Sequence, residues 1–265
     1  MDDLEAERAR RWWHHSRAVH NLRRAASFVG DVDFALLFPA RRLALPSLWQ
    51  ATVDRPVDEQ PAEWAPDVER VWRWKDELPL HGLAWSGRFR RRRPSLLSPA
   101  LLDELYPRGG EPDDFLDEPA LGDDARRVAA TLLSAGPLPS SALRRTLGMD
   151  DRAGQARFDR AVAELGRCLV VTGYGSEEPA AGGRGWPGAV LELTARAFPL
   201  QPEPDRAAAR VRAARRFLAT MIVARPLDLA TTLGWPAGEA RDAIEALVDL
   251  GHAAEDGAGY RLLHP

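Results

Sequence analysis

Apolar residues in the C-terminal half of the chain recur in an order that suits three helices followed by two strands. In the third segment, Phe158, Val162 and Leu165 lie four and then three residues apart, which places them on one face of a helix. The expected elements are helices over 124–135, 140–148 and 152–166 and strands over 169–172 and 189–193. Three helices closed by a β-hairpin are the order of a winged helix-turn-helix, which the pattern therefore predicts.

The same order of elements occurs a second time toward the C-terminus. Apolar stripes and turn residues predict helices over 206–223, 226–233 and 236–250 and strands over 252–255 and 260–263. Leucine–glycine pairs mark matching helix ends, at 147–148 and 165–166 in the first copy and at 233–234 and 250–251 in the second. Glycine is favoured just after a helix because it adopts the left-handed conformation without strain. The sequence therefore predicts two winged helices in tandem.

The N-terminal half has a different character, with prolines and tryptophans spread through a mixed pattern. Residues 83–89 alternate as in a strand, and Ser98 followed by Pro99 begins a short apolar helix. Residues 111–124 hold seven carboxylates and no cation, which indicates a solvated connector. The predicted fold class is α+β, mainly α. The predicted domains are a basic N-terminal helix over 1–27, an α+β and conceivably winged-helix-like domain over 28–110, an acidic linker over 111–123, and winged helices over 124–199 and 200–265.

Composition narrows the class of protein further. The 265 residues include 36 Lys+Arg, 39 Asp+Glu and one cysteine, Cys168, which favours a reducing, cytoplasmic compartment. Lys75 is the only lysine, and its surroundings do not fit a Walker A phosphate loop. There is no signal-peptide pattern and no apolar run long enough to cross a membrane. The histidines lack metal-ligand spacing, so we expect neither a metal nor a cofactor.

Arginines on the predicted third helix of the first copy indicate a DNA-binding surface. Arg157 and Arg160 fall on its polar side, and Arg184 lies in the long loop of the wing. A winged helix often places its third helix in the major groove, where arginines neutralise phosphates of double-stranded DNA. The alternative is a solvated arginine face. The matching helix of the second copy is acidic, so we expect it to avoid DNA and to offer a surface for a protein partner.

The densest basic segment surrounds Phe89, at the end of the predicted strand. It comprises Arg88, Arg90, Arg91, Arg92 and Arg93. Contact with a nucleic-acid backbone is the functional interpretation of this run. The alternative is a basic turn whose charge the acidic connector compensates.

Residues 72–79 combine the groups that removal of a damaged base would need. Trp72 and Trp74 can stack on an extruded base, and Asp76 or Glu77 can orient the attacking water. Lys75 offers an amine that could form a Schiff base. The alternative is structural: tryptophans two residues apart form the core-facing stripe of a strand, and the carboxylates pair with arginines.

Four motifs give the chain a resemblance to a known family. They are FALLFP at 34–39, LPSLW at 45–49, WRWKDELP at 72–79 and RPSLLS at 93–98, followed by the winged helices. Together they resemble the subgroup related to the AlkZ/YcaQ-type winged-helix DNA glycosylases. The resemblance implies a DNA partner and excision of alkylated bases. Those enzymes carry a Gln-apolar-Gln or similar motif, whereas no two glutamines of this chain are separated by one residue. Gln50 is the one glutamine in a comparable N-terminal position.

These observations predict a DNA-binding winged-helix protein that hydrolyses the N-glycosidic bond of damaged bases. The expected catalytic groups are Asp76 or Glu77, with Lys75 and Gln50 as less favoured participants. The alternative function is a non-enzymatic DNA-binding regulator or a protein-interaction scaffold.

Overall fold

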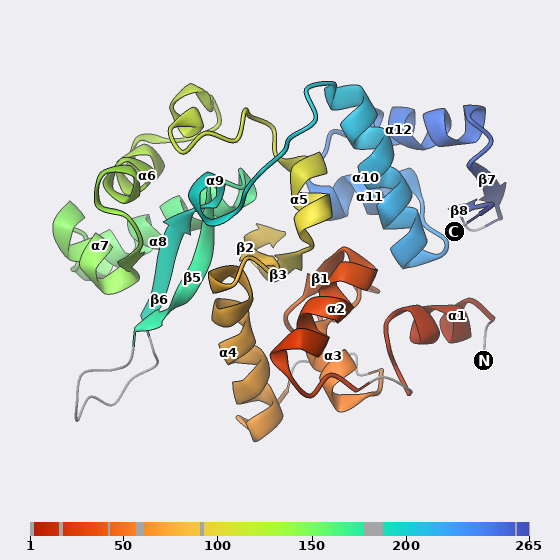
Figure 1. Ribbon diagram of the computed structural model, residues 1–265, viewed down its shortest axis with the longest axis horizontal. Coiled ribbons are helices and arrows are strands. Elements are labelled where there is room, and N and C mark those ends of the chain that lie inside the picture. The colour runs from red at the N-terminus through yellow and green to blue at the C-terminus, as the bar shows by residue number, and fades with distance from the viewer. Residues whose placement is uncertain are drawn as a thin grey trace.

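The N-terminal half combines helices with a small antiparallel sheet (Figure 1). The computed structural model of the protein describes residues 3–15, 18–41, 43–56, 61–90, 93–177, 188–257 and 259–264. The N-terminal elements are α1 (Asp3–Arg11), α2 (Leu22–Val32), β1 (Phe34–Leu36), α3 (Leu48–Val53), α4 (Pro66–Leu80), β2 (Trp85–Arg90), β3 (Arg93–Leu97) and α5 (Pro99–Leu105). The strands pair antiparallel in the order β1-β3-β2.

Two local expectations for this half are wrong. Residues 72–79 form the second half of helix α4 rather than a strand, and Pro66 occupies the start of that helix, where a proline costs no hydrogen bond. The basic N-terminal segment forms two helices rather than one, because Asn21 caps a second start by accepting a hydrogen bond from the Arg24 amide.

The first repeated copy has the predicted order, and its helix boundaries lie within a residue of those expected. Its elements are α6 (Asp123–Ala135), β4 (Leu138–Pro139), α7 (Ser140–Leu147), α8 (Arg152–Arg167), β5 (Val171–Glu177) and β6 (Gly188–Leu193), with the short α9 (Thr194–Ala197) after them. The strands pair in the order β4-β6-β5. Asp151 begins α8 by accepting a hydrogen bond from the Gly154 amide at 2.6 Å.

The second copy repeats that order with a shorter hairpin. It consists of α10 (Arg206–Met221), α11 (Pro226–Leu233), α12 (Ala237–Asp249), β7 (Ala253–Asp256) and β8 (Gly259–Leu262). Ala224 bridges Tyr260, in the place that β4 holds in the first copy. Gly148 and Gly234 both end their helices with positive φ, 65° and 74°. The predicted fold class, α+β and mainly α with tandem winged helices, is confirmed.

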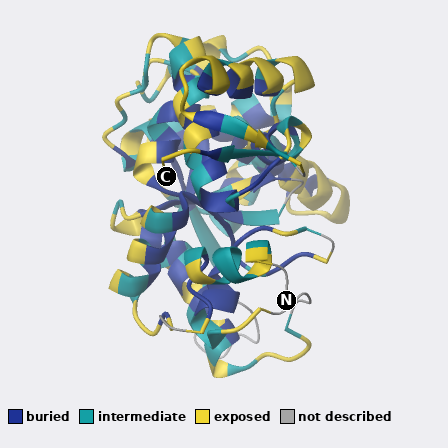
Figure 2. Ribbon diagram, turned by 90° about the vertical axis from the view of Figure 1, so that its right-hand side faces the viewer, coloured by how far each residue is buried: buried dark blue, intermediate teal, exposed yellow. Residues whose placement is uncertain are grey.

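Two hydrophobic cores hold these elements. The first copy has its own core, centred on residues such as Leu132, Leu143 and Phe158. The larger core combines the N-terminal half with the second copy, so that Phe28 and Ile244 belong to one cluster. Buried positions run through the interior in Figure 2, while the outer helices carry many exposed ones. The cores therefore do not follow the predicted domains one by one, because the predicted N-terminal domain and the second winged helix share a core.

Side-chain hydrogen bonds join the N-terminal sheet to the first copy. The Thr172 hydroxyl on β5 accepts from the Ser86 amide at 3.2 Å and lies 3.1 Å from the Ser86 carbonyl, to which it donates. The Trp85 indole donates to the Thr194 hydroxyl at 3.1 Å. Helix α8 approaches β2 closely at Gly166, where an added Cβ would lie 3.1 Å from the Arg88 amide nitrogen. These contacts hold the N-terminal sheet and the first copy at a defined distance from each other.

The acidic connector is packed against the protein and is not simply solvated. Arg108 is largely buried and pairs with Asp114 at 3.0 Å and with Glu118 at 2.8 Å. Phe115 in the 3₁₀ turn η1 (Asp114–Asp117) inserts into the core of the first copy. Within the described residues, no helix combines the length and apolar content that a membrane crossing requires.

Candidate active-site cleft

A cavity of about 300 Å³ lies between the N-terminal half and the first copy. Residues of α4 and β2 form one wall, and residues of α7, α8, β5 and β6 form the other. Of the predicted site residues that the structure describes, four line it: Trp72, Lys75, Asp76 and Arg88. This volume lies at the small end of the range for ligand pockets, about 300–1,000 Å³. We call this cavity the α4 cleft.

Helix α4 positions the charged pair of the cleft. The Lys75 ammonium contacts the Asp76 carboxylate, and both side chains are largely buried, with 14% and 8% of their surface exposed. Gly173 on β5 covers this pair, since a Cβ there would lie 3.7 Å from Asp76 Oδ1. A larger residue at Gly173 would therefore narrow the cleft next to the carboxylate.

Burial sets the protonation behaviour of Asp76. Loss of hydration raises the pKa of Asp76, and this effect outweighs the opposing charge and hydrogen bond of Lys75. The nearby carboxylate of Glu77 raises the pKa of Asp76 further. A carboxylate with a raised pKa is a stronger base toward water, which is the behaviour a general base needs.

The two tryptophans of α4 have different environments. Trp72 lines the cleft, and its ring stacks on Phe38 with centroids 6.3 Å apart and planes at 19°. The Lys75 ammonium lies 4.9 Å from the Trp72 ring centroid. Trp74 is 3% exposed and belongs to the large core. Residues two apart on a helix differ in direction by about 160°, so Trp74 points away from the cleft that Trp72 lines.

The opposite wall contains residues that the sequence reasoning missed. The Arg144 guanidinium lies 5.7 Å from the Phe158 ring centroid, and among the described residues its buried Nε has no hydrogen-bond partner. At the rim, Arg88 and Asp159 form an ion pair of 3.6 Å. Arg144 and Arg145 stand together in the predicted helix 140–148, and this pair of cations could have marked Arg144 as a candidate. The apolar pattern of α8 does not show that this helix packs against β2.

Two predicted catalytic residues lie outside the cleft lining. Gln50 is buried on α3, where its carbonyl oxygen accepts a hydrogen bond from the Ser47 hydroxyl at 2.9 Å. Glu77 pairs with Arg73 at 3.5 Å along α4. The structure thus brings Lys75 and Asp76 together at the cavity and does not bring Gln50 or Glu77 to it.

The predicted DNA-contacting arginines differ in accessibility. Arg157 and Arg160 on α8 are exposed, and Arg157 pairs with Asp124 through bonds of 2.8 and 2.6 Å. Arg90 is buried, and its Nε donates to the Thr231 carbonyl of the second copy at 3.2 Å, so it is unsuited to phosphate contact. Arg93 is half-buried. Three predicted residues lie outside the described part of the chain: Arg91, Arg92 and Arg184.

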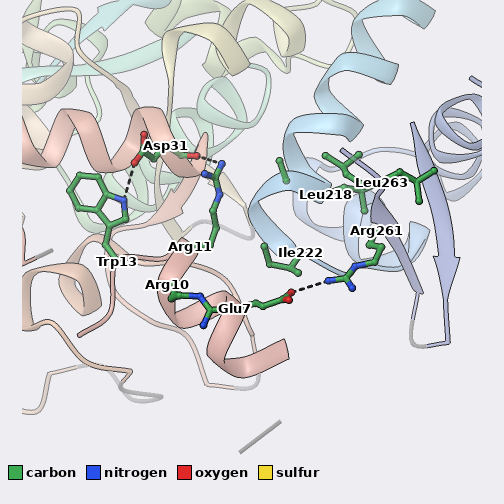
Figure 3. A pocket seen from close by; sticks show the side chains of 11 residues that line it. Glu7, Arg10, Arg11, Trp13, Asp31, Leu218, Ile222, Arg261 and Leu263 are labelled. Atoms are coloured by element: carbon green, nitrogen blue, oxygen red, sulfur yellow. Dashed lines mark hydrogen bonds and ion pairs between the residues drawn. The ribbon is translucent and has the colours of Figure 1, made fainter. Parts of the chain in front are cut away.

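A larger cavity, of about 730 Å³, separates the N-terminal helices from α10 and β8 (Figure 3). Several of its polar groups bond to one another. Glu7 pairs with Arg261 at 2.9 Å, and the Trp13 indole donates to Asp31 at 2.9 Å. Among the residues that the structure describes, no predicted site residue lines it. Within the described residues, no cluster of three or more His, Cys, Asp or Glu is arranged to bind a metal.

The fold and the cleft define a winged-helix protein with a buried carboxylate between its N-terminal half and its first winged helix. The chain belongs to the AlkZ-related family, whose model matches residues 19–225. The structure is similar to that of the Streptomyces sahachiroi DNA glycosylase AlkZ, with a TM-score of 0.60 and 13% sequence identity. That similarity covers 98% of this chain and 69% of the other. No curated protein matches at the sequence level.

Proposed function

We propose that the protein binds double-stranded DNA and hydrolyses the N-glycosidic bond of a damaged base in the α4 cleft. The observation that carries this proposal is the buried carboxylate of Asp76 beside the half-buried ring of Trp72 in one cavity. Family membership and the fold shared with a DNA glycosylase support the same class of substrate.

The chemistry follows from the groups that line the cleft. A nucleotide extruded from the duplex places its base against Trp72, because aromatic rings stack on bases of any sequence. Cleavage of the C1′–N bond develops positive charge on the sugar, as in other glycoside hydrolyses. Asp76 stabilises that charge and takes a proton from the water that attacks C1′. The base leaves with the electrons of the C1′–N bond.

Exposed arginines near the cleft provide the contacts to the DNA backbone. Arg157 and Arg160 lie on the outer side of α8, while another face of this helix lines the cleft through Phe158 and Gly166. Helix α8 therefore carries both the arginines that bind phosphates and part of the lining of the proposed reaction site. Arg88 at the rim offers a further cation. Such contacts make binding weaker as salt concentration rises.

The test is release of 7-methylguanine from a duplex that carries it at one position. We expect wild-type protein to generate abasic sites and Asp76→Asn to lose this activity, because the amide cannot accept the proton from water. Glu69→Gln is the matched control: it changes an exposed carboxylate on the same helix that does not line the cleft, so it should keep the activity. If wild-type protein binds the duplex in a salt-dependent way but releases no base, the result would instead support the alternative function, a non-enzymatic DNA-binding regulator.

A further inference from the structure

The cleft contains the only lysine of the protein. Every other basic side chain except the histidines is an arginine, and guanidinium groups do not form imines with aldehydes under ordinary conditions. The Lys75 ammonium lies 4.9 Å from the Trp72 ring centroid and contacts the Asp76 carboxylate. The fold therefore places the one side-chain amine of the chain in the cavity proposed to receive an extruded nucleotide.

The contact with Asp76 gives Lys75 a route to its nucleophilic form. Both side chains are largely buried, so their charged forms lose much of their hydration. Burial raises the pKa of Asp76, which makes the carboxylate a better acceptor for the ammonium proton. When the amine attacks a carbonyl, the Asp76 carboxylate is the adjacent acceptor for its proton.

We propose that Lys75 is a nucleophile for abasic sites, and that the protein cleaves the DNA strand on the 3′ side of such a site. The proposal rests on the DNA binding proposed above and goes beyond base excision, because an abasic site from any source is a substrate. The electrophile is the C1′ aldehyde of the ring-opened sugar, and no base needs to occupy the cleft.

Each step of this reaction balances within the protein, the DNA and water. The Lys75 Nζ forms a bond to C1′. Asp76 gives the proton it accepted from Lys75 to the carbinolamine hydroxyl, which leaves as water, so that an iminium ion and the Asp76 carboxylate result. That carboxylate then removes a proton from C2′, and the C3′–O bond breaks to release the 5′-phosphate end of the downstream strand. Water then hydrolyses the iminium ion, which restores the amine and leaves an unsaturated aldehyde on the upstream strand.

Borohydride trapping tests the proposal directly. The protein is incubated with a duplex whose abasic site was made beforehand by removing a uracil, and sodium borohydride reduces the iminium ion to a stable covalent adduct. We expect wild-type protein to give an adduct that peptide mass mapping assigns to Lys75. Because the chain has one lysine, the competing amine is its α-amino group, which the same mapping distinguishes.

Two variants provide the matched controls. Lys75→Arg keeps the positive charge beside Asp76 and should lose both the adduct and strand cleavage. The double variant Arg73→Lys/Lys75→Arg restores the number of lysines but moves the amine to an exposed position on α4. We expect this variant to form no adduct. Thermal unfolding of each variant checks that it is folded, and the mapping on wild-type protein does not depend on either variant.

Several results would overturn the proposal: no adduct with wild-type protein on a duplex that it binds, an adduct on the α-amino group alone, or an adduct with the double variant. Its failure can be separated from that of base excision. An adduct at Lys75 without release of 7-methylguanine contradicts the excision alone, whereas release without an adduct contradicts the lysine nucleophile alone. A protein that does not bind DNA contradicts both.

Discussion

The two winged-helix copies share one order of elements but bury their helices against different neighbours. The first copy surrounds a core of its own, whereas α10 and α12 of the second share a core with the N-terminal helices and sheet. The N-terminal segment fastens this contact: the Trp12 indole donates to the Thr220 carbonyl at 2.8 Å, and Arg8 donates to the Met221 carbonyl at 3.0 Å. A repeated pattern thus predicts the local fold of each copy without predicting which of its surfaces stays free.

The third helices differ in charge as well as in surroundings. Helix α8 exposes Arg157 and Arg160 and lines the cleft with another face. Helix α12 exposes Asp242, Glu245 and Asp249, which would repel a phosphate backbone. In the proposed function the first copy meets the DNA, whereas the second copy packs against the N-terminal half.

Core truncations should give the largest difference between the copies. Ile244 and Leu143 are both fully buried, one in the shared core and the other in the core of the first copy. Each substitution to alanine should lower the free energy of unfolding by about 2–5 kcal/mol, because it leaves a cavity. Amide hydrogen exchange should then separate them. Ile244→Ala should speed exchange in the N-terminal half as well as in 206–262, and Leu143→Ala mainly within 115–193.

Two outcomes would contradict the different packing of the two copies. Faster exchange confined to 206–262 in Ile244→Ala would mean that the second copy is an independent unit despite its contacts. Faster exchange throughout the chain in Leu143→Ala would mean that the first copy is equally coupled to the rest.

Acid should weaken the side of the molecule that holds the second copy. Burial and the nearby charge of His15 lower the pKa of His14 to about 4, against 6.5 ordinarily, although Asp54 opposes the shift. The unfolded state therefore binds more protons between these pH values, so stability falls as pH drops from about 6.5 toward 4. The pKa difference of His14 between the folded and unfolded states corresponds to a loss of about 3 kcal/mol in the free energy of unfolding. His14→Phe should remove this part of the pH dependence in urea unfolding.

A buried residue without a titratable group provides the control for that measurement. Val19 is 1% exposed, and Val19→Ala should lower stability while keeping the pH dependence of wild-type protein. The same slope in wild-type and His14→Phe between pH 6.5 and 4 would show that His14 does not carry the effect. Exchange in the first copy should change less with acid than exchange near the N-terminal helices.

Local sequence signals predicted the copies well because each depends on short-range chemistry. The leucine–glycine pairs identified the ends of α7 and α11, where Gly148 and Gly234 have positive φ. The segment 72–79 was harder, since its tryptophan spacing fits a strand and the helix start at Pro66 is six residues upstream. Because the segment is a helix, Trp72 and Trp74 lie on different sides of it. Trp72 lines the cleft and Trp74 is buried in the core.

The candidate site was predictable only in part, because it forms between segments distant in the chain. Lys75, Asp76 and Trp72 stood out as chemistry-bearing neighbours, and the structure places them on one cavity. Arg144 and Phe158 come from the first copy, and their position opposite α4 depends on the packing of α8 against β2. Arg90 shows the converse: a residue in a basic run can be buried by a contact with α11 that its neighbours in sequence do not reveal.

The smallest expected effect concerns the ion pair that restrains Arg157. Asp124 accepts two hydrogen bonds from Arg157, and the pKa of Asp124 is lowered mainly by that bonding, so the carboxylate is charged at neutral pH. Asp124→Asn should release the guanidinium for a phosphate. DNA affinity should therefore rise modestly, and the slope of log affinity against log salt should steepen by about one unit.

Asp242→Asn on α12 is the matched control, since it removes the same charge from the exposed face of the second copy. If only the first copy meets the duplex, this variant should bind DNA with the affinity and the salt slope of wild-type protein. Fluorescence anisotropy titrations over a series of salt concentrations measure both quantities. An equal gain for the two variants would mean that DNA responds to net charge alone. The contrast between α8 and α12 would then not decide where the duplex lies.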